Sequence, residues 1–423
     1  MLSNLISQIQ MIIDRVFLGQ MDILFMSAVG NATAPMWTTM SFIFSLSMGA
    51  SILISQSVGE KNFEKAKDYA ASLIKFHNVL PVVLFLFWMF LSPTVFKIMG
   101  VSENVAPFCI TYTRLYAPTF LILGLGASYG VVFQTSNYTK PLVAYGIIRS
   151  GLNIFLDYVL IFGKLGFPRM EIAGAALGTT IAEYAGALYL VFVIIKKKKN
   201  FFTSPGLKRI ITSKIGLYLN SIKLGVNSAC EDLLWNIGNL CIIRILNTID
   251  EKAAGIYSMV FTVEILIVVI IGSIGSGTLT ISGEATGAKN LKLYRNVVKT
   301  ALQWSFLVSA FALIFISIFP RLTLSLFTKD KAVIEMSVIY IILVAINLFG
   351  KSGNIIVGNG IRGYGDTKWM LFTQGFGTVC VISLSALCVF VFKLGMLGVF
   401  IAVLCDEAIR AVINLIRFLK IKF

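Results

Sequence analysis

The stretch Gly59-Glu60-Lys61-Asn62 recurs 228 residues later as Gly287-Ala288-Lys289-Asn290. The dipeptide Thr139-Lys140 recurs at the same offset as Thr367-Lys368. Two anchors that share one offset indicate that the chain contains two copies of one unit. Membrane proteins built from two such repeats usually have a cleft between them, and secondary transporters bind their substrates there.

The composition indicates a membrane protein rather than a set of soluble domains. Hydrophobic residues make up 57% of the 423 residues, charged residues 13%, and the mean hydropathy is +0.85. Twelve apolar segments are long enough to span a bilayer. We predict that all are helices, because lipid offers no partner for unpaired backbone groups. They lie near 2–20, 32–57, 70–98, 107–133, 141–163, 172–195, 222–247, 254–283, 299–320, 333–357, 370–392 and 395–416.

The repeat and the segments together predict the architecture: an all-α polytopic membrane protein with twelve transmembrane helices in two six-helix parallel repeats around a central cleft. The first lobe spans 1–195 and the second 222–423, joined by a basic cytoplasmic linker at 196–221. Alternating apolar and basic residues at 207–219 predict an amphipathic helix on the membrane surface; a disordered linker is the alternative. Because the repeat offset leaves helix 1 without an opening turn, we expect that helix to be truncated at its start.

The formal net charge of +16 is explained by the topology. With the N-terminus inside, nineteen basic residues lie in inner loops and only eight in outer ones, so both termini are predicted to be cytoplasmic in a multi-pass plasma-membrane protein. The eight are Lys97, Lys164, Arg169, Lys252, Arg321, Lys329, Lys331 and Lys393. No base-stacking platform or groove-reading motif accompanies the basic residues, so we expect the lipid bilayer, and no nucleic acid, as a partner.

The cysteine and histidine content argues against metal chemistry and catalysis. Six cysteines lie singly in apolar segments, without metal-binding spacing, and are expected to be small core residues. His77 is the only histidine, which excludes histidine clusters by count. A membrane enzyme would need a catalytic cluster such as paired acids with a histidine. We therefore predict that the chain is not an enzyme and has no cofactor.

Acidic and amide side chains inside apolar segments mark the first functional candidate, because charge within a bilayer is costly. Asp14 lies in the first segment, and Asn153 and Asp157 lie four residues apart on one face of the fifth. Together they could bind Na⁺ through hard oxygen ligands or hold a proton on one carboxyl group. Alternatively, Asp14 forms a static ion pair with Arg149 or Arg114.

The second half does not copy these acids, since the position equivalent to Asp14 is Ile242. It offers Glu231 and Glu264 instead, which we consider candidates for a cleft that attracts a cationic substrate. Glu264 could instead pair with Arg244 or Lys351.

Two further features carry structural predictions. Glu183 and Glu407 occupy repeat-equivalent positions, at an offset of 224, and are expected to be architectural. Pro118 predicts a kink in the fourth segment, because its ring removes one backbone hydrogen bond.

Four stretches resemble the multidrug and toxic compound extrusion (MATE) family of antiporters. They are ISQSVG at 54–59 followed by Lys65-Ala66, the helix 5 pattern LN..LD..LIFG at 152–163, GAALGT at 174–179 and RGYGDTK at 362–368. The resemblance covers essentially the whole chain, and we place it closest to the DinF-like branch.

This resemblance implies a monomeric antiporter, driven by Na⁺ or H⁺, that exports bulky organic compounds, cationic or amphipathic in character. It places the coupling-ion site at Asp14, Asn153 and Asp157, with Thr179 as a helix 6 ligand. The wider superfamily also holds flippases for lipid-linked oligosaccharide or cell-wall precursors, which remain the alternative. A flippase would need a basic cavity, here built from Arg114, Arg149, Arg244 and Lys351.

Overall fold

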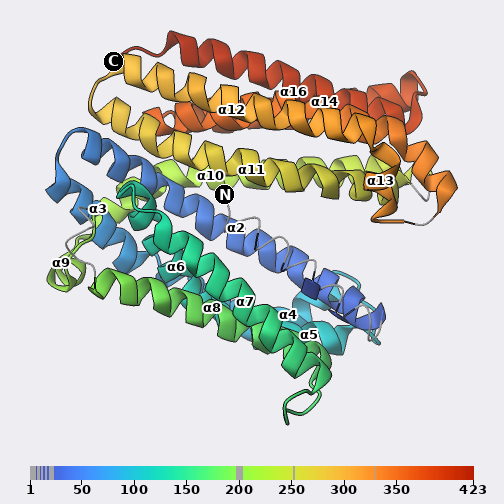
Figure 1. The fold of residues 1–423 in the computed structure, drawn as a ribbon, viewed down its shortest axis with the longest axis horizontal. Helices are drawn as coiled ribbons and strands as arrows, with labels where there is room; N and C mark the ends of the chain where they lie inside the picture. The colour runs from blue at the N-terminus through green and yellow to red at the C-terminus, as the bar shows by residue number, and fades with distance from the viewer. Residues whose placement is uncertain are drawn as a thin grey trace. The chain divides into compact units, whose positions relative to one another are not determined.

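The computed structural model describes residues 6, 10, 13, 14, 17, 18, 23–196, 203–250, 253–328 and 330–423. Every regular element in these residues is helical (Figure 1). The elements are α2 (Ile23–Gly59), α3 (Phe63–Phe76), α4 (Val79–Ile98), α5 (Ala106–Tyr116), α6 (Thr119–Thr135), α7 (Lys140–Phe162), α8 (Glu171–Lys196), α9 (Leu207–Thr212), α10 (Ile215–Asn247), α11 (Ala253–Gly287), α12 (Leu291–Ile318), α13 (Pro320–Ser325), α14 (Lys331–Tyr364), α15 (Thr367–Ala386), the π-helix η2 (Leu387–Val391) and α16 (Gly395–Lys420).

The chain forms two compact units. Unit 2 contains the described residues of Leu2–Ile54 together with Asn62–Ala229, and unit 1 contains Ser55–Lys61 together with Cys230–Phe423. The end of α2 therefore belongs to unit 1, and the first half of α10 belongs to unit 2. The lobe boundaries predicted from the sequence stay a prediction.

The stretch that revealed the repeat forms the same turn twice. Lys61 and Lys289 both have left-handed backbones, with φ of 58° and 52°. The next residues, Asn62 and Asn290, cap α3 and α12: each side chain accepts a hydrogen bond from the backbone N–H three residues on, at 3.0 and 2.9 Å. Such caps satisfy donors that the first turn of a helix leaves free. The repeated sequence thus encodes one helix–turn–helix connection in both halves.

Gly59 and Gly287, which precede these turns, permit a close helix crossing within unit 1. A Cβ added to Gly59 would lie 2.7 Å from the carbonyl carbon of Glu284. A Cβ added to Gly287 would lie 2.7 Å from the carbonyl carbon of Gln56, the residue equivalent to Glu284. The α2 and α11 backbones meet here at small residues, as helices in membranes commonly do.

In unit 2, α8 packs against α5, α6 and α7, and α4 packs against α5 and α6. A buried cluster that includes Phe96, Cys109 and Ala176 joins α4, α5 and α8. The axes of α5 and α6 meet at 48° across Ala117 and Pro118. The predicted kink at Pro118 is confirmed.

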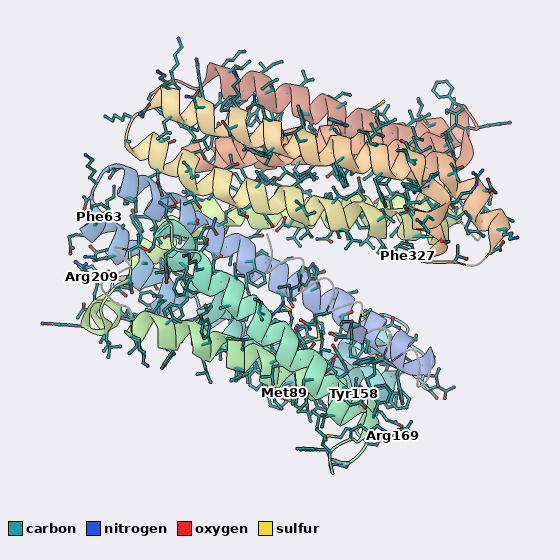
Figure 2. The ribbon with its side chains drawn as sticks, viewed as in Figure 1. Phe63, Met89, Tyr158, Arg169, Arg209 and Phe327 are labelled. Atoms are coloured by element: carbon teal, nitrogen blue, oxygen red, sulfur yellow. The ribbon has the colours of Figure 1, made fainter. Side chains whose placement is uncertain are left out.

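The linker contains a shorter helix than expected. Within unit 2, Arg209 of α9, which is labelled in Figure 2, forms an ion pair of 2.6 Å with Glu64 of α3. Lys75 Nζ donates to the carbonyl oxygen of Ile211 at 2.6 Å. Both contacts join α9 to α3, and α10 starts three residues after α9 ends. The prediction of one amphipathic helix over 207–219 is therefore wrong, because Lys75 satisfies a carbonyl at the point where α9 stops.

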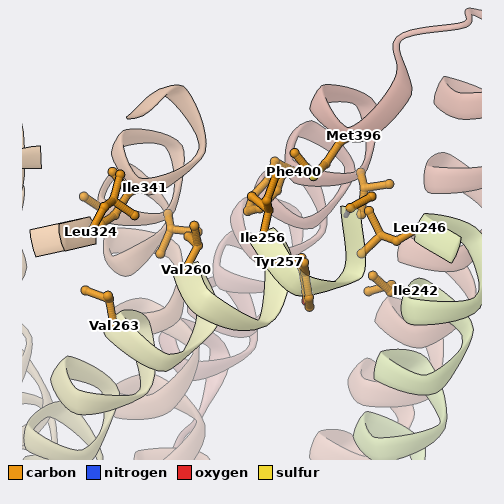
Figure 3. Close-up of a cluster of buried hydrophobic side chains, with 14 of the residues drawn as sticks. Ile242, Leu246, Ile256, Tyr257, Val260, Val263, Leu324, Ile341, Met396 and Phe400 are labelled. Carbon is orange, nitrogen blue, oxygen red and sulfur yellow. The ribbon is translucent and has the colours of Figure 1, made fainter. Parts of the chain in front are cut away.

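In unit 1, α14 is the central helix and packs against α11, α12 and α16, while α15 packs against α16 (Figure 1). Figure 3 shows part of its largest apolar core. There Ile242 of α10, Val260 of α11, Ile341 of α14 and Phe400 of α16 are all buried. This core holds the helices that carry the polar residues of the second half.

Within the described residues, eight helices are long and apolar enough to cross a membrane, and the bent α5–α6 pair makes a ninth. The predicted segments 222–247 and 395–416 match α10 and α16, which carry more polar and charged residues. The predicted segment 2–20 lies mostly outside the described residues.

Candidate functional site

Asp14 lies in a partly buried position, held by an amide. Gln10 Nε2 donates to Asp14 Oδ2 at 3.3 Å, and Ser150 Oγ of α7 donates to Gln10 Oε1 at 3.0 Å. Gln10 is 7% exposed and Ser150 is fully buried. A chain of two hydrogen bonds thus connects Asp14 to α7.

The other predicted residues come from α7 and α8. Asn153 and Asp157 are fully buried, and Asn153 Nδ2 donates to Asp157 Oδ1 and to Thr179 Oγ1, both at 3.2 Å. The prediction that Asn153 and Asp157 share one helix face is therefore confirmed. Thr179 Oγ1 in turn donates to the Ala175 carbonyl at 2.9 Å, so its hydroxyl oxygen is oriented by its own helix.

Three oxygens of this group are buried without a hydrogen-bond partner: Asp14 Oδ1, Asn153 Oδ1 and Asp157 Oδ2. The carboxyl groups of Asp14 and Asp157 are neighbours. Unpaired buried oxygens are costly unless something binds them. The arrangement suits a proton or a small hard cation.

Each of the two arginines named for a static ion pair at Asp14 has another partner, although the charge of Arg149 also acts on Asp14. Arg149 pairs with Glu183 of α8, whose other oxygen accepts a hydrogen bond of 3.0 Å from Tyr145. Arg114 is exposed, and its Nε donates to the Met89 carbonyl at 3.1 Å.

Sequence reasoning missed Gln10 and Ser150. Both carried a detectable signal, because Gln10 is four residues before Asp14 and Ser150 three residues before Asn153, on the same helix faces. Neutral polar residues in apolar segments attracted less attention than the acids.

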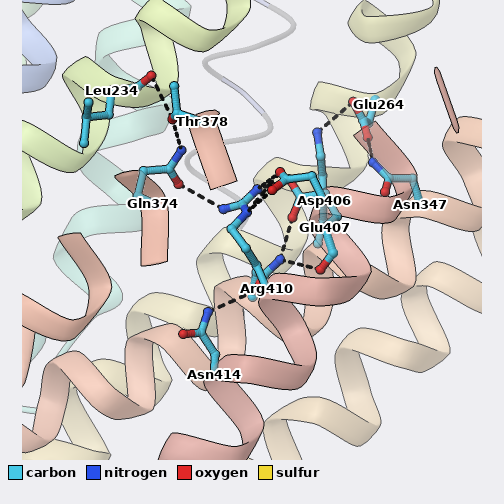
Figure 4. Close-up of polar contacts among 11 residues, drawn as sticks. Leu234, Glu264, Asn347, Gln374, Thr378, Asp406, Glu407, Arg410 and Asn414 are labelled. Atoms are coloured by element: carbon cyan, nitrogen blue, oxygen red, sulfur yellow. Dashed lines mark hydrogen bonds and ion pairs between the residues drawn. The ribbon is translucent and has the colours of Figure 1, made fainter. Parts of the chain in front are cut away.

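The acids of the second half are paired with basic residues (Figure 4). Arg410 of α16 binds Asp406 at 2.9 Å and Glu407 at 2.8 Å, and its Nη1 donates to Gln374 of α15 at 2.9 Å. Asn354 Nδ2 of α14 donates to Glu407 at 2.6 Å. Gln374, Asp406, Glu407 and Arg410 line a cavity within unit 1.

The two predicted cleft acids are also paired. Glu264 forms an ion pair of 2.9 Å with Lys351 and accepts a hydrogen bond of 3.3 Å from Asn347. The alternative that Glu264 pairs with Lys351 is confirmed. Glu231 pairs with Arg362, a contact the sequence did not suggest. A cationic substrate would have to compete with these basic residues.

Among the described residues, no group of three or more histidine, cysteine, aspartate or glutamate side chains is arranged to hold a metal ion. The first-half oxygens differ from such a cluster, because amide and hydroxyl groups accompany the two carboxyl groups. This ligand set consists of hard oxygens, which suit hard cations.

Repeated helical halves and carboxyl groups buried inside them define the class of protein, a polytopic membrane transporter. The sequence model of the MatE family matches residues 1–159 and 228–387, and the chain belongs to that family. It is a MATE transporter and not an enzyme.

Curated relatives have similar lengths. The chain is 27% identical over 418 residues to "Probable multidrug resistance protein NorM" of Thermotoga maritima, covering 97% of this chain and 88% of that protein. It is 23% identical to "Multidrug export protein MepA" of Staphylococcus aureus, covering 80% and 73%. It is 22% identical to "FAD transporter" of Shewanella oneidensis, covering 81% and 75%.

Solved structures confirm the fold class. A structure described as the "Outward-facing conformation of a multidrug resistance MATE family transporter of the MOP superfamily" has a TM-score of 0.89 and 18% identity, covering 99% of this chain and 92% of that chain. A structure of MATE in the bent conformation gives the same TM-score. The predicted all-α polytopic membrane fold is therefore correct.

Proposed function

We propose that this MATE transporter is an antiporter in which Na⁺ or H⁺, bound at Asp14, Asn153, Asp157 and Thr179, drives export of a bulky organic compound. The two halves rock to expose the compound alternately to each side of the membrane. Ion binding and substrate binding favour opposite conformations, which couples the two flows.

The observation that carries this proposal is the set of three buried, unpartnered oxygens on Asp14, Asn153 and Asp157. If these oxygens never bound anything, the free-energy cost of burying them would not be offset by any interaction. An ion that binds and leaves in each cycle explains why neutral amides, those of Gln10 and Asn153, hold the two carboxyl groups.

The driving force is adequate for substrate export. One charge moving down about 100 mV supplies about 2.3 kcal/mol. That free energy corresponds to a roughly fifty-fold concentration of substrate for each coupled charge. A single carboxyl pair that carries one cation can therefore support useful accumulation outside the cell.

The finer assignments belong to the same proposal. We place the chain in the DinF-like branch, as a monomer with both termini in the cytoplasm, because of its motifs and its asymmetric loop charge. Small organic cations or amphipathic compounds are its proposed cargo, with Glu231 and Glu264 near the path. Relatives named for multidrug export support this class, whereas the relative named as an FAD transporter suggests that cargo varies within the family.

Flipping of lipid-linked precursors is less well supported. That function needs free basic residues to bind a diphosphate, yet Arg149 and Lys351 are paired with acids. Arg114 and Arg244 are exposed on the surface of their helices.

The proposal is tested by ethidium efflux from vesicles that contain wild type or Asp157→Asn, with Na⁺ and pH gradients imposed separately. We expect efflux that requires one of the gradients in wild type and is absent in the variant. Gradient-driven efflux that survives in Asp157→Asn would refute the assignment of the site.

A further inference from the structure

Helix α8 passes Asp157 at a glycine. Gly178 is buried, and a Cβ placed on it would overlap Asp157 Oδ1 and lie 3.4 Å from the Asp157 backbone nitrogen. Gly178 is within a regular helix, and no left-handed backbone requires a glycine there. Space for the carboxyl group is therefore the physical reason for glycine at this position.

The missing side chain lets the Asp157 carboxyl group lean against the α8 backbone. In this position Oδ1 is held by Asn153 Nδ2 at 3.2 Å, while Oδ2 has no partner. Asn153 Oδ1, on the same helix face, is also without a partner. One helix face of α7 therefore carries two oxygens without partners, Asp157 Oδ2 and Asn153 Oδ1.

Asp14, the other acid of the site, is held by a separate pair of hydrogen bonds. Gln10 holds its Oδ2 at 3.3 Å, and Ser150 holds Gln10 at 3.0 Å, which leaves Asp14 Oδ1 unpartnered. The two carboxyl groups are therefore each held by one oxygen and offer the other. Gly178 leaves room for the Asp157 carboxyl group, and Gln10 holds the Asp14 carboxyl group.

From this geometry we infer that Gly178 is the residue that lets the site accept Na⁺ and not a proton alone. A sodium ion needs room for several oxygen ligands around it. A proton needs none, because a protonated carboxyl group donates to its neighbour at about 2.5–2.7 Å. A methyl group at position 178 would overlap Asp157 Oδ1 and displace that carboxyl group from the place where Asn153 holds it. The displacement removes the ligand arrangement that Na⁺ needs, whereas the displaced carboxyl group can still bind a proton.

This inference rests on the proposed coupling site, and the experiment separates the two. Equilibrium binding of radioactive Na⁺ to the purified full-length protein at alkaline pH is compared for wild type, Gly178→Ala and Gly151→Ala. Gly151 is the matched control: it is exposed, lies on α7 with Asp157, and has no atom within 4 Å of an added Cβ. Efflux driven by a pH gradient without Na⁺ is measured for the same proteins.

We expect Gly178→Ala to weaken Na⁺ binding by at least about tenfold, a loss of about 1.4 kcal/mol. Proton-driven efflux should remain within about threefold of wild type, and Gly151→Ala should match wild type in both assays. Wild-type Na⁺ affinity in Gly178→Ala would overturn the inference, as would absence of Na⁺ binding by wild type. Equal loss of Na⁺ binding and proton-driven efflux would also overturn it, because the methyl group would then damage the pair in general.

A second variant covers the case in which Gly178→Ala does not fold. Asp157→Glu places a longer carboxyl group against the same Gly178 surface. If the space beside Gly178 limits Na⁺ binding, this variant should bind Na⁺ at least about tenfold more weakly than wild type, and Na⁺ binding at wild-type strength would contradict the inference. Failure of the coupling site itself gives a different result, since Asp157→Asn would then keep cation-driven efflux.

Discussion

The two halves treat their buried acids differently. In the first half Asp157 is held by the amide of Asn153, whereas in the second half Glu264 is held by the ammonium group of Lys351. A carboxylate with a basic partner is already neutralised, and removing that partner is costly. A carboxylate held by neutral groups still needs a cation. This difference supports the proposal that the coupling ion binds in the first half.

One feature is common to both halves. Glu183 of α8 and Glu407 of α16 are repeat-equivalent, and each is paired with an arginine. The arginine comes from a different helix in each case: Arg149 lies on α7, but Arg410 lies on α16 beside its own glutamate. The sequence-based view that these glutamates are architectural agrees with their pairing.

In each half, a glycine occupies the position that is equivalent to the arginine of the other half. The residue equivalent to Arg410 is Gly186, and the residue equivalent to Arg149 is Gly377. An added Cβ on Gly186 would lie 3.4 Å from Arg149 Cβ, and one on Gly377 would overlap the Arg410 side chain. In the first half the arginine lies on α7 and packs beside a glycine of α8. In the second half the arginine lies on α16 and packs beside a glycine of α15.

The largest difference between the halves is expected in transport. Asp157→Asn should reduce gradient-driven ethidium efflux by at least about a hundredfold, because the neutral amide cannot carry the coupling charge. Asp406→Asn should retain most efflux, since Arg410 keeps Glu407 as a partner. Initial efflux rates at matched protein content provide the measurement. Equal losses in both variants would erase the distinction.

Folding stability should depend more on the ion pairs of the second half than on Asp157. Arg410→Gly leaves Asp406 and Glu407 buried without their cation, and breaking a buried pair this way costs about 3–5 kcal/mol. Thermal unfolding in detergent should show a clear fall in the midpoint. Asp157→Asn, which removes a charge without a basic partner, is the control and should be stable. A stable Arg410→Gly variant would show that the pair is not structural.

The equivalence of the two arginine positions is tested by moving the second-half arginine from position 410 to position 377. The double variant Arg410→Gly with Gly377→Arg copies the first-half arrangement into the second half. We expect it to recover at least about 1 kcal/mol relative to Arg410→Gly alone, because the guanidinium group again reaches Glu407. The unfolding midpoints of the single and double variants are compared. A double variant less stable than the single one would show that an arginine at position 377 cannot replace Arg410.

The smallest effect is expected at Glu264. Lys351→Met should destabilise the protein by about 1–3 kcal/mol, because it leaves a buried carboxylate unpaired. Adding Glu264→Gln should restore most of this loss, since both charges are then gone. Unfolding of the two variants is compared with wild type. If the double variant is no better than Lys351→Met, the lysine acts through its packing against Phe261 instead.

The sequence predicted features whose cause is local. Asn153 and Asp157 could be placed together because helical spacing alone brings them onto one face. Pro118 could be assigned a kink because its chemistry acts on its own helix. The repeat predicted two copies of one unit, and the structure adds that its two asparagines cap equivalent helices.

Contacts between distant helices could not be predicted in this way. Glu231 meets Arg362 across 131 residues, and nothing near either residue indicates the other. The role of Gly178 depends on where α7 carries Asp157, so it was read from the sequence as a motif glycine only. The break after α9 was missed because Lys75, which satisfies its carbonyl, belongs to another helix.

Cation release on substrate binding tests the central claim most directly. Ethidium is added to purified protein preloaded with Na⁺ or H⁺, and the released ion is counted. Because antiport requires substrate and ion to disfavour each other's binding, wild type should release about one cation per protein. Asp406→Asn should behave as wild type and Asp157→Asn should release none. Undiminished release from Asp157→Asn would contradict the account.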